Sequence, residues 1–330
     1  MHSEKSGPDW VSAGDVAKLL SVVEAVEAVE DALRAGLDPS ADPDRMAVEL
    51  GPDRGQLLLM PATLDHSLGV KIVTVAPEHR ARTQPRISAV YAYFDGELQP
   101  SALIDGTVLT TLRTSAVSAL AVRQLSRPTA SRLVVFGSGP QAKAHIEAFR
   151  AVRPITRVSV VGRNPDTTGE LLDWCRAGGL AAEAGTPGDV ARADIVACCT
   201  TAVEPLFDGD LVHDGACVVA IGSHVPTARE LDDGLLGRSL VVVEDAPTAL
   251  REAGDVVQAV ACGALDPADL VTLTQLSRLS PATDRPRVFK AVGMAWEDLV
   301  VAAAVVARYR DHSIARQRGP APAPAATSGG

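Results

Sequence analysis

The stretch "RLVVFGSGPQAKAHIEAFRAV", residues 132–152, decides the fold. An apolar run leads into a glycine-rich turn, and apolar residues at helical spacing follow it. This order is typical of a dinucleotide-binding loop, in which one glycine permits a tight turn and a second lets the backbone approach a pyrophosphate. The free N–H groups at the helix start favour that anion. The alternative is a purely structural turn, and the cofactor-binding residues that the loop predicts are Gly137, Ser138, Gly139, Pro140 and Gln141.

The chain after this loop continues to alternate between short apolar runs and helical patterns. "RVSVVGRN" (157–164), "DIVACCTT" (194–201), "ACVVAIGSH" (216–224) and "SLVVVED" (239–245) read as strands, and "TTGELLDWCRAGG" (167–179) reads as a helix. Strands that alternate with helices predict a doubly wound parallel sheet of the Rossmann type.

The end of the second strand bears on the choice of cofactor. A domain that prefers NAD usually ends this strand with an acid that bonds the ribose hydroxyls. Here the strand ends in Gly162, Arg163 and Asn164, without a carboxylate. Arg163 could pair with a 2′-phosphate of the cofactor. Alternatively, it is an exposed arginine at the end of the strand with no role in binding. The sequence therefore favours NADP(H) over NAD(H), with Arg163 and Asn164 as cofactor contacts.

The first third of the chain has a different pattern. "SVVEAVEAVEDALRAGL" (21–37) and "TVLTTLRTSAVSALAVRQL" (107–125) predict helices, "QLLLMP" (56–61) and "GVKIVTV" (69–75) predict strands, and residues 87–104 predict a hairpin with a type I′ turn at Asp95-Gly96. A long buried helix is expected over 287–312. The predicted class is α/β, with a Rossmann domain at 119–294 and a second α+β domain with a mixed sheet, for substrate binding and dimerisation, at 1–118 plus about 295–315. A disordered tail is expected at 316–330, which is rich in Pro, Ala, Gly and Ser.

Composition narrows the choice of partners and compartment. The net charge of −10 over 330 residues argues against nucleic acid as a partner. No run approaches the roughly 20 apolar residues of a membrane span, and the first residues lack the apolar core of a signal peptide. The five cysteines show neither metal-site spacing nor an even framework, so we expect free, mostly buried thiols, no metal site and a cytoplasmic protein.

Several cations stand out on otherwise neutral or apolar elements. Lys71 shares a predicted strand face with Val73 and Val75, and Arg113 interrupts a neutral helix. Arg45 lies in "DPDRMAVEL". Taken singly, each is more often a surface or ion-paired residue, but if the fold converges them they could clamp a substrate carboxylate.

Motifs along most of residues 40–305 resemble the ornithine cyclodeaminase/mu-crystallin family. These are "GVKIVTVAP", "IDGTVLTTLRTSAVSALAV", "VVFGSGPQAKAH", "AIGSHVPTARELD" and "VFKAVGMAWEDL", in the family's order. The resemblance implies a nicotinamide cofactor, an amino or imino acid substrate and a homodimer formed through the non-Rossmann domain. It implies that Arg45, Lys71 and Arg113 bind the substrate carboxylate and that the segment at Gly293 and Met294 approaches the nicotinamide. Further cofactor contacts are expected at Thr114, Thr200 and Gly222.

Two positions separate the subclasses of this family. Where cyclodeaminases of the family carry an acid after the strand-end glycine, this sequence has His224, and where they carry a Glu before "MP" it has Leu58. An ω-ammonium group would meet no counter-charge from either residue, and burying it unpaired is costly. The resemblance therefore favours NAD(P)H-dependent reduction of a C=N bond next to a carboxylate, in a cyclic ketimine or an imine of an α-keto acid.

Other roles and functions stay open at this point. His224 or Lys71 could donate the proton to nitrogen, and His224 could instead only pack against or bond the cofactor. Arg86 could be a surface charge, or could reach a second acidic group of the substrate or the cofactor phosphates. The alternative functions are an ornithine cyclodeaminase, an alanine-type amino-acid dehydrogenase and a non-catalytic NADPH-binding protein of the crystallin kind.

Overall fold

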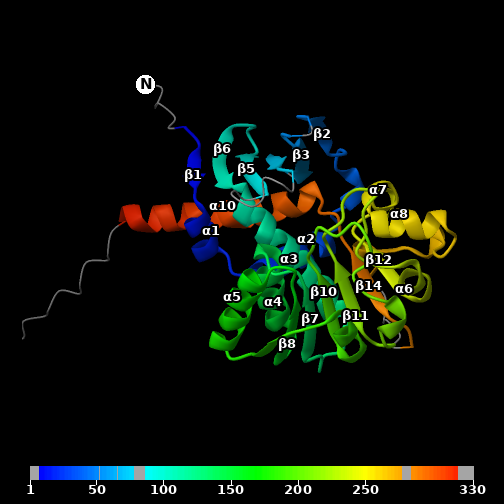
Figure 1. Ribbon diagram of the computed structural model, residues 1–330. Helices are drawn as coiled ribbons and strands as arrows, with labels where there is room; N and C mark the ends of the chain where they lie inside the picture. Colours follow the sequence, from blue (N-terminus) through cyan, green and yellow to red (C-terminus); the bar gives the residue numbers. More distant parts are fainter. Residues whose placement is uncertain (1–6, 52, 65, 78–85, 277–283, 319–330) are drawn as a thin grey trace, which may run out of the picture.

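The part of the chain that the computed structural model describes contains two β-sheets, with the helices α3 and α10 between them (Figure 1). The structure describes residues 7–51, 53–64, 66–77, 86–276 and 284–318. Of the tail expected at 316–330, residues 319–330 lie outside these ranges, and the preceding residues continue a helix. No helix in the described ranges combines the length and the apolar character that a membrane crossing requires.

The parallel sheet follows the glycine-loop pattern. Within the described ranges it has eight strands, all parallel, in the order β13-β12-β14-β11-β10-β7-β8-β9. Their bounds are β7 Arg132–Phe136, β8 Arg157–Val161, β9 Ala181–Ala184, β10 Ile195–Cys198, β11 Cys217–Ala220, β12 Leu240–Val243, β13 Val271–Thr272 and β14 Arg287–Lys290. The order reverses between β7 and β10, which is where doubly wound sheets bind their ligands. This confirms the predicted fold class.

One prediction about this sheet is wrong. Residues 287–312 were expected to form a single helix, but β14 occupies the first of them, between β11 and β12. The hydrophobic pattern of so short an apolar run does not distinguish a strand from a helix. The pairing of β14 with β11 and β12 is a contact between distant parts of the sequence, which no local pattern reveals. The helices that accompany the parallel sheet are α4 Pro140–Val152, α5 Pro165–Ala177, α6 Asp233–Arg238, α7 Ala246–Glu252, α8 Gly254–Ala261 and α9 Leu273–Leu276.

The second sheet is mixed, as expected. In the described part of the chain its order is β1-β6-β5-β4-β3-β2, with only β1 and β6 parallel. The bounds are β1 Asp9–Val11, β2 Met46–Glu49, β3 Gln56–Leu64, β4 Ser67–Val75, β5 Ile87–Phe94 and β6 Pro100–Asp105. The β5–β6 hairpin is present, but its turn is longer than the type I′ turn that Asp95-Gly96 predicted. The Asp95 carboxylate accepts from the N–H groups of Glu97 and Gln99, and Leu98 takes the positive φ of +60°.

Within the described ranges, four helices pack around the mixed sheet or link it to the parallel one. They are α1 Ala13–Leu19, α2 Val22–Arg34, α3 Gly106–Leu125 and α10 Ala295–Arg318, and α10 packs on α2, α3, β3 and β4. The expected domain boundary at residue 118 falls inside α3, whereas the one at 294–295 coincides with the start of α10. His145 of α4 bonds Ser118 of α3 at 3.0 Å, so the two sheets are also joined through these helices. All five cysteines are free thiols, and Cys262 is the exposed one.

Candidate active site

A cavity of about 490 Å³ lies between the two sheets. Its walls come from β3 and β4 of the mixed sheet, from α3, and from the segments that follow β10, β11 and β14 of the parallel sheet. The carboxyl ends of strands from one sheet therefore face the side chains of the other. Most residues that the sequence predicted for the site line this cavity: Arg45, Lys71, Arg86, Arg113, Thr114, Gln141, Thr200, Gly222, His224 and Gly293.

Lys71 reaches the cavity because of strand alternation. Gly69, Lys71 and Val73 face inward on β4, with Lys71 opposite Met60 of β3. Its ammonium is almost fully buried and donates to Asp298 at 2.6 Å. Burial, and next the charge of Arg113, lower the pKa of Lys71 to about 8 against the opposing pull of Asp298. Lys71 is therefore charged at neutral pH and close to losing its proton above it.

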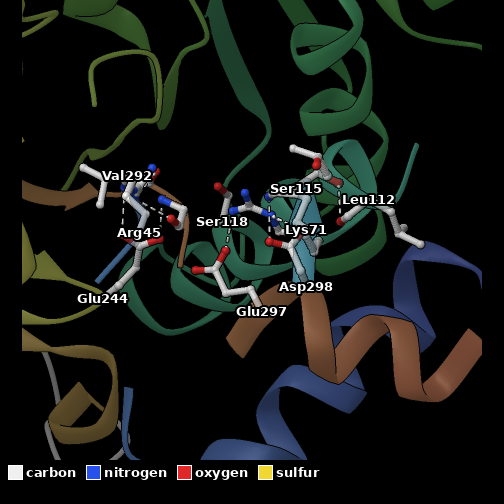
Figure 2. Close-up of polar contacts among 12 residues, drawn as sticks. Arg45, Lys71, Leu112, Ser115, Ser118, Glu244, Val292, Glu297 and Asp298 are labelled. Carbon is white, nitrogen blue, oxygen red and sulfur yellow. Dashed lines mark hydrogen bonds and ion pairs between the residues drawn. The ribbon is translucent and has the colours of Figure 1, made fainter. Parts of the chain in front are cut away.

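Arg113 lies on the same buried ion-pair network. Thr110, Arg113 and Thr114 share the face of α3 that lines the cavity, as their three- and four-residue spacing requires. The Arg113 guanidinium donates from Nη1 to Glu297 at 2.5 Å and from Nε to Asp298 at 3.2 Å. Figure 2 shows Lys71 pointing at Asp298, with Glu297 on the same turn of α10. One fully buried carboxylate thus fixes both cations that were predicted to hold a substrate carboxylate.

A second buried acid continues the network to the loop after β14. Glu244, which follows β12, accepts from the N–H groups of Val292 at 2.7 Å and Gly293 at 2.9 Å. Burial, and next the charge of Glu244, raise the pKa of Glu297 well above its ordinary value. The negative charge of Glu244 thus adds to burial in disfavouring ionisation of Glu297, while the Arg113 guanidinium opposes this effect. Gly293 has φ of +77°, and a side chain there would collide with the Arg113 guanidinium.

Arg45 binds the same loop from the other side. Its guanidinium donates to the carbonyls of Gly293 at 2.7 Å and Val292 at 3.2 Å, and it pairs with Glu252 at 2.9 Å (Figure 2 shows Arg45 beside Val292). Arg45, Lys71 and Arg113 therefore line one cavity. Each of them already has a carboxylate partner that holds its side chain in place.

The glycine loop has the shape that a bound pyrophosphate requires. Gly137 has φ of +103°, and a Cβ at this position would lie 2.5 Å from the carbonyl oxygen of Cys199. At Gly139, which caps α4 without a side-chain bond, an added Cβ would meet no atom within 4 Å. The free N–H groups of this 13-residue helix thus face open space. Gln141 lines the cavity and its buried Oε1 has no partner among the described residues. These residues fit a dinucleotide.

A buried carboxylate joins the loops after β10 and β11. Glu230 accepts from the N–H of Thr200 at 2.9 Å, the hydroxyl of Thr200 at 2.7 Å and the N–H of Gly222 at 2.7 Å. Burial raises the pKa of Glu230 to about 7, with Asp255 adding to the rise and Lys290 opposing it. Lys290, at the end of β14, pairs with Asp255 at 3.0 Å and donates to the carbonyl of Ser223 at 2.7 Å. This second network shapes the rim of the parallel sheet.

His224 is half-buried in the cavity wall. Burial lowers the pKa of His224, and the nearby charges of Arg45, Lys290 and Arg86 lower it as well. The imidazole is therefore neutral at physiological pH in the unliganded protein. A neutral imidazole can position a ligand, but it is a poor proton donor.

The remaining predicted contacts lie at or beyond the edge of the cavity. Arg163 is exposed after β8 and lies 3.4 Å from the hydroxyl of Thr201, a residue of the cavity lining. The Asn164 side chain caps α5 by accepting from two N–H groups, and the hydroxyl of Ser138 bonds Thr167 of α5 at 2.7 Å. Met294 is buried beside a smaller cavity of about 130 Å³ rather than the large one. Direct cofactor contact by these four residues stays a prediction.

The acids that organise the site were missed in the sequence. Six buried charged residues are involved: Glu230, Glu244, Asp255, Lys290, Glu297 and Asp298. A signal was present, because "VVVED" and "VFK" end apolar strands in a charge and "WEDLVV" sets two acids in an apolar helix. Buried charges of this kind are normally paired, so each implied a partner elsewhere.

The fold and cavity define an α/β protein of the dinucleotide-binding type, with a second, cation-bearing wall built by a mixed sheet. Residues 8–313 match the profile of the ornithine cyclodeaminase/mu-crystallin family, and the chain belongs to this family.

Individual relatives point to the imine-reducing branch. Delta(1)-pyrroline-2-carboxylate reductase of Colwellia psychrerythraea is 32% identical over 288 residues, which cover 83% of this chain and 91% of the relative. Ketimine reductase mu-crystallin of Mus musculus is 32% identical over 309 residues, covering 90% and 96%. The structure of Thermococcus litoralis Delta(1)-pyrroline-2-carboxylate reductase in complex with NADH and L-proline superposes with a TM-score of 0.85 at 26% identity, covering 92% of this chain and 98% of that one. These findings confirm the predicted resemblance to imine- and ketimine-reducing members.

Proposed function

We propose that this protein is an NAD(P)H-dependent reductase of a C=N bond next to a carboxylate, which yields an amino acid. The observation that carries the proposal is the buried Lys71–Asp298–Arg113 arrangement, which faces the glycine-loop sheet across one cavity. The relatives and the solved structure named above are reductases of such imines, which supports it.

The chain's own residues account for substrate orientation in this reaction. When bound, the nicotinamide supplies a hydride to the imine carbon and leaves oxidised, while nitrogen gains a proton. Lys71 and Arg113 attract the carboxylate, and because Asp298 fixes them the adjacent imine carbon is presented in one orientation. Fixed orientation of this kind supplies a large part of catalysis. An imine that is already protonated needs little further acid help.

The cavity lining disfavours ring-closing deamination. Among the described lining residues there is no Asp or Glu, and Leu58 and His224, which the family resemblance assigns to the positions of the cyclodeaminase acids, both line the cavity. An amino-acid dehydrogenase on the same scaffold stays an alternative, since it uses the same carboxylate clamp. A non-catalytic NADPH-binding role is less well supported, because all three carboxylate-binding cations are retained.

NADP(H) is the cofactor we propose over NAD(H). Arg163 ends β8 where an NAD-preferring domain usually carries an acid, and the exposed guanidinium is accessible to a 2′-phosphate. Support for a nicotinamide cofactor in general is broader, since the T. litoralis structure holds NADH.

An assay of NADPH oxidation at 340 nm, with Δ1-pyrroline-2-carboxylate or Δ1-piperideine-2-carboxylate as substrate, would test this function. Turnover that yields proline or pipecolate is expected, with a higher kcat/KM for NADPH than for NADH. Release of ammonia from ornithine without net turnover of the nicotinamide would instead establish a cyclodeaminase. Tight NADPH binding without turnover of any imine, keto acid or amino acid would support the non-catalytic role.

Replacing His224 by Gln is expected to lower kcat at pH 7 by less than about tenfold, because the lowered pKa keeps the imidazole neutral. General acid catalysis is typically worth about 10²–10⁴-fold, so the assay discriminates clearly. The variant's NADPH affinity serves as the control for folding. A fall in kcat of a hundredfold or more, with NADPH affinity intact, would assign His224 as the proton donor.

We also propose that the protein is a cytoplasmic homodimer that pairs through the mixed sheet. Met46 and Ile72 lie on one line across the sheet, through the Met46–Leu59 and Leu59–Ile72 pairs, on the face away from the cavity. Both side chains are exposed, as is that of Val48 on the same face. An exposed apolar sheet face is typical of an interaction surface, and the free thiols suit a reducing compartment.

A further inference from the structure

Arg86 lies in the cavity wall, at a distance from the carboxylate clamp. Its carbonyl accepts from the N–H of Ala76 at 2.8 Å, which places it just beyond the end of β4 and before the start of β5. The side chain lines the large cavity and is half-buried. Arg86 is therefore a residue of the same binding space as Lys71 and Arg113, although it belongs to a different part of the wall.

Among the residues that the structure describes, Arg86 lacks the carboxylate partner that the other cavity cations have. Arg45, Lys71 and Arg113 each pair with a carboxylate. Among the described residues, no carboxylate lies within ion-pair distance of Arg86, and the described part of the cavity lining holds none. A partly desolvated guanidinium gains most from a planar anion that can accept two hydrogen bonds. Within the described lining, Arg86 is thus a charge that a ligand can neutralise.

The wall between Arg86 and the clamp is apolar. Lys71 and Ala76 lie five positions apart in extended chain, about 16 Å along the backbone at the usual strand rise. Val73 and Val75 line this interval on β4, and Leu58 lines it on β3 opposite Val73. The reach of the Lys71 and Arg86 side chains into the cavity shortens the gap between the two charges. The cavity therefore has a positive site at each end of an apolar middle.

We propose that Arg86 binds a second anionic group of the substrate, so that the preferred substrate is a dicarboxylic imine. One carboxylate stands next to the C=N bond and is held by Lys71 and Arg113, and the other ends an apolar chain and is held by Arg86. This inference rests on the proposed function, since it assigns the substrate class of the same site. A phosphate of the cofactor is the other anion that could neutralise Arg86, and the experiment separates the two.

The test compares two keto acids of equal chain length, 2-oxoadipate and 2-oxohexanoate, each condensed with methylamine and reduced with NADPH. The wild-type protein is expected to favour the dianionic imine in kcat/KM by roughly tenfold or more, as a charged hydrogen-bonded pair allows. In Arg86→Gln this preference is expected to disappear, and in Arg86→Lys to survive in part. Arg54→Gln is the matched control, because Arg54 is exposed close to the same rim and does not line the cavity.

Three outcomes overturn the inference. One is a wild-type protein that does not favour the dianionic imine, and another is an Arg86→Gln variant that keeps the preference. The third is an equal loss for both imines together with weaker binding of NADPH but not of NADH in a fluorescence titration, which would assign Arg86 to the cofactor phosphate.

A separate measurement keeps this inference distinct from the proposed function. If Δ1-pyrroline-2-carboxylate and all other imines fail to oxidise NADPH, the proposed reductase activity is wrong. Calorimetric titration of 2-oxoadipate and 2-oxohexanoate into the NADPH complex then decides the role of Arg86 without turnover. Tighter binding of the dianion that is lost in Arg86→Gln supports the second anion site, and equal affinities refute it.

Discussion

Asp298→Asn is expected to lower kcat/KM for a carboxylate-bearing imine by about two to three orders of magnitude. Asp298 is fully buried and accepts from both Lys71 and Arg113. An Asn side chain has nearly the same shape, but it removes the negative charge and turns an amide N–H₂ toward one of the cations. Removing one partner of a buried ion pair typically costs about 3–5 kcal/mol, because the remaining charge is left uncompensated. The two cations would repel each other and lose their common orientation.

Steady-state kinetics and urea unfolding together measure this effect. We expect the free energy of unfolding to fall by several kcal/mol and KM for the imine to rise along with the loss of kcat. Asp311→Asn is the matched control, because Asp311 is exposed on the same helix and the substitution there is expected to change neither quantity appreciably. If Asp298→Asn behaves like the control in both measurements, Asp298 does not organise the clamp.

Ligand binding by Lys71 is expected to be lost as the pH rises through about 8. In the folded protein, burial lowers the pKa of Lys71 to that value. Below it the ammonium is charged and attracts a carboxylate, and above it this attraction disappears. Affinity should therefore fall by up to tenfold per pH unit above about pH 8 and level off when Arg113 alone remains charged. The inhibition constant of pyrrole-2-carboxylate, whose ring nitrogen is not basic, measures this between pH 6.5 and 9.5.

The contribution of Lys71 to the free energy of unfolding changes in the opposite direction over this range. Unfolded Lys71 keeps its proton up to about pH 10.5, whereas the folded residue has released it, so this group makes folding more favourable between about pH 8 and 10.5. The titration of Lys71 thus lowers affinity in this window without itself lowering stability. Lys71→Arg should remove the inflection, because a guanidinium stays charged, and Lys71→Met should weaken binding at every pH. An inhibition constant that is flat in the wild-type protein would contradict the assignment.

The parts of the fold that local sequence could predict are those with a local cause. Gly137 and Gly139 predict the loop, because the positive φ of Gly137 and the open space beside Gly139 both depend on the absence of a side chain. The β5–β6 turn was predicted with the wrong geometry, since Asp95 stabilised a longer loop through its side chain. The local pattern predicts a helix over residues 287–290. They form a strand because they pair with residues 217–220 and 240–243, which are distant in the sequence.

The residues of the candidate site likewise include some that local sequence predicts and some that only the fold reveals. Lys71 and Arg113 were found because a cation on an apolar or neutral element is unusual in itself. Their partner Asp298 follows them by 227 and 185 positions, and only the packing of α10 between the sheets brings these groups together. The role of Glu244 in holding the loop after β14 likewise depends on a contact across 48 and 49 positions. Which charges need a partner can thus be inferred from sequence, while the choice of partner requires the fold.

The position of β14 and α10 has a consequence for how the protein is made on the ribosome. Domains generally fold as they emerge, N-terminal parts first. Here the strand that fills the middle of the parallel sheet, between β11 and β12, and the helix that covers the mixed sheet both come from residues 287–318. A nascent chain that has been translated only to residue 286 carries Lys71 and Arg113 without Asp298 and has a gap in its parallel sheet. The parallel sheet is therefore completed, and the mixed sheet covered by α10, only after residues 287–318 have been synthesised, and the cation-bearing wall of the cavity cannot be fixed by Asp298 before then.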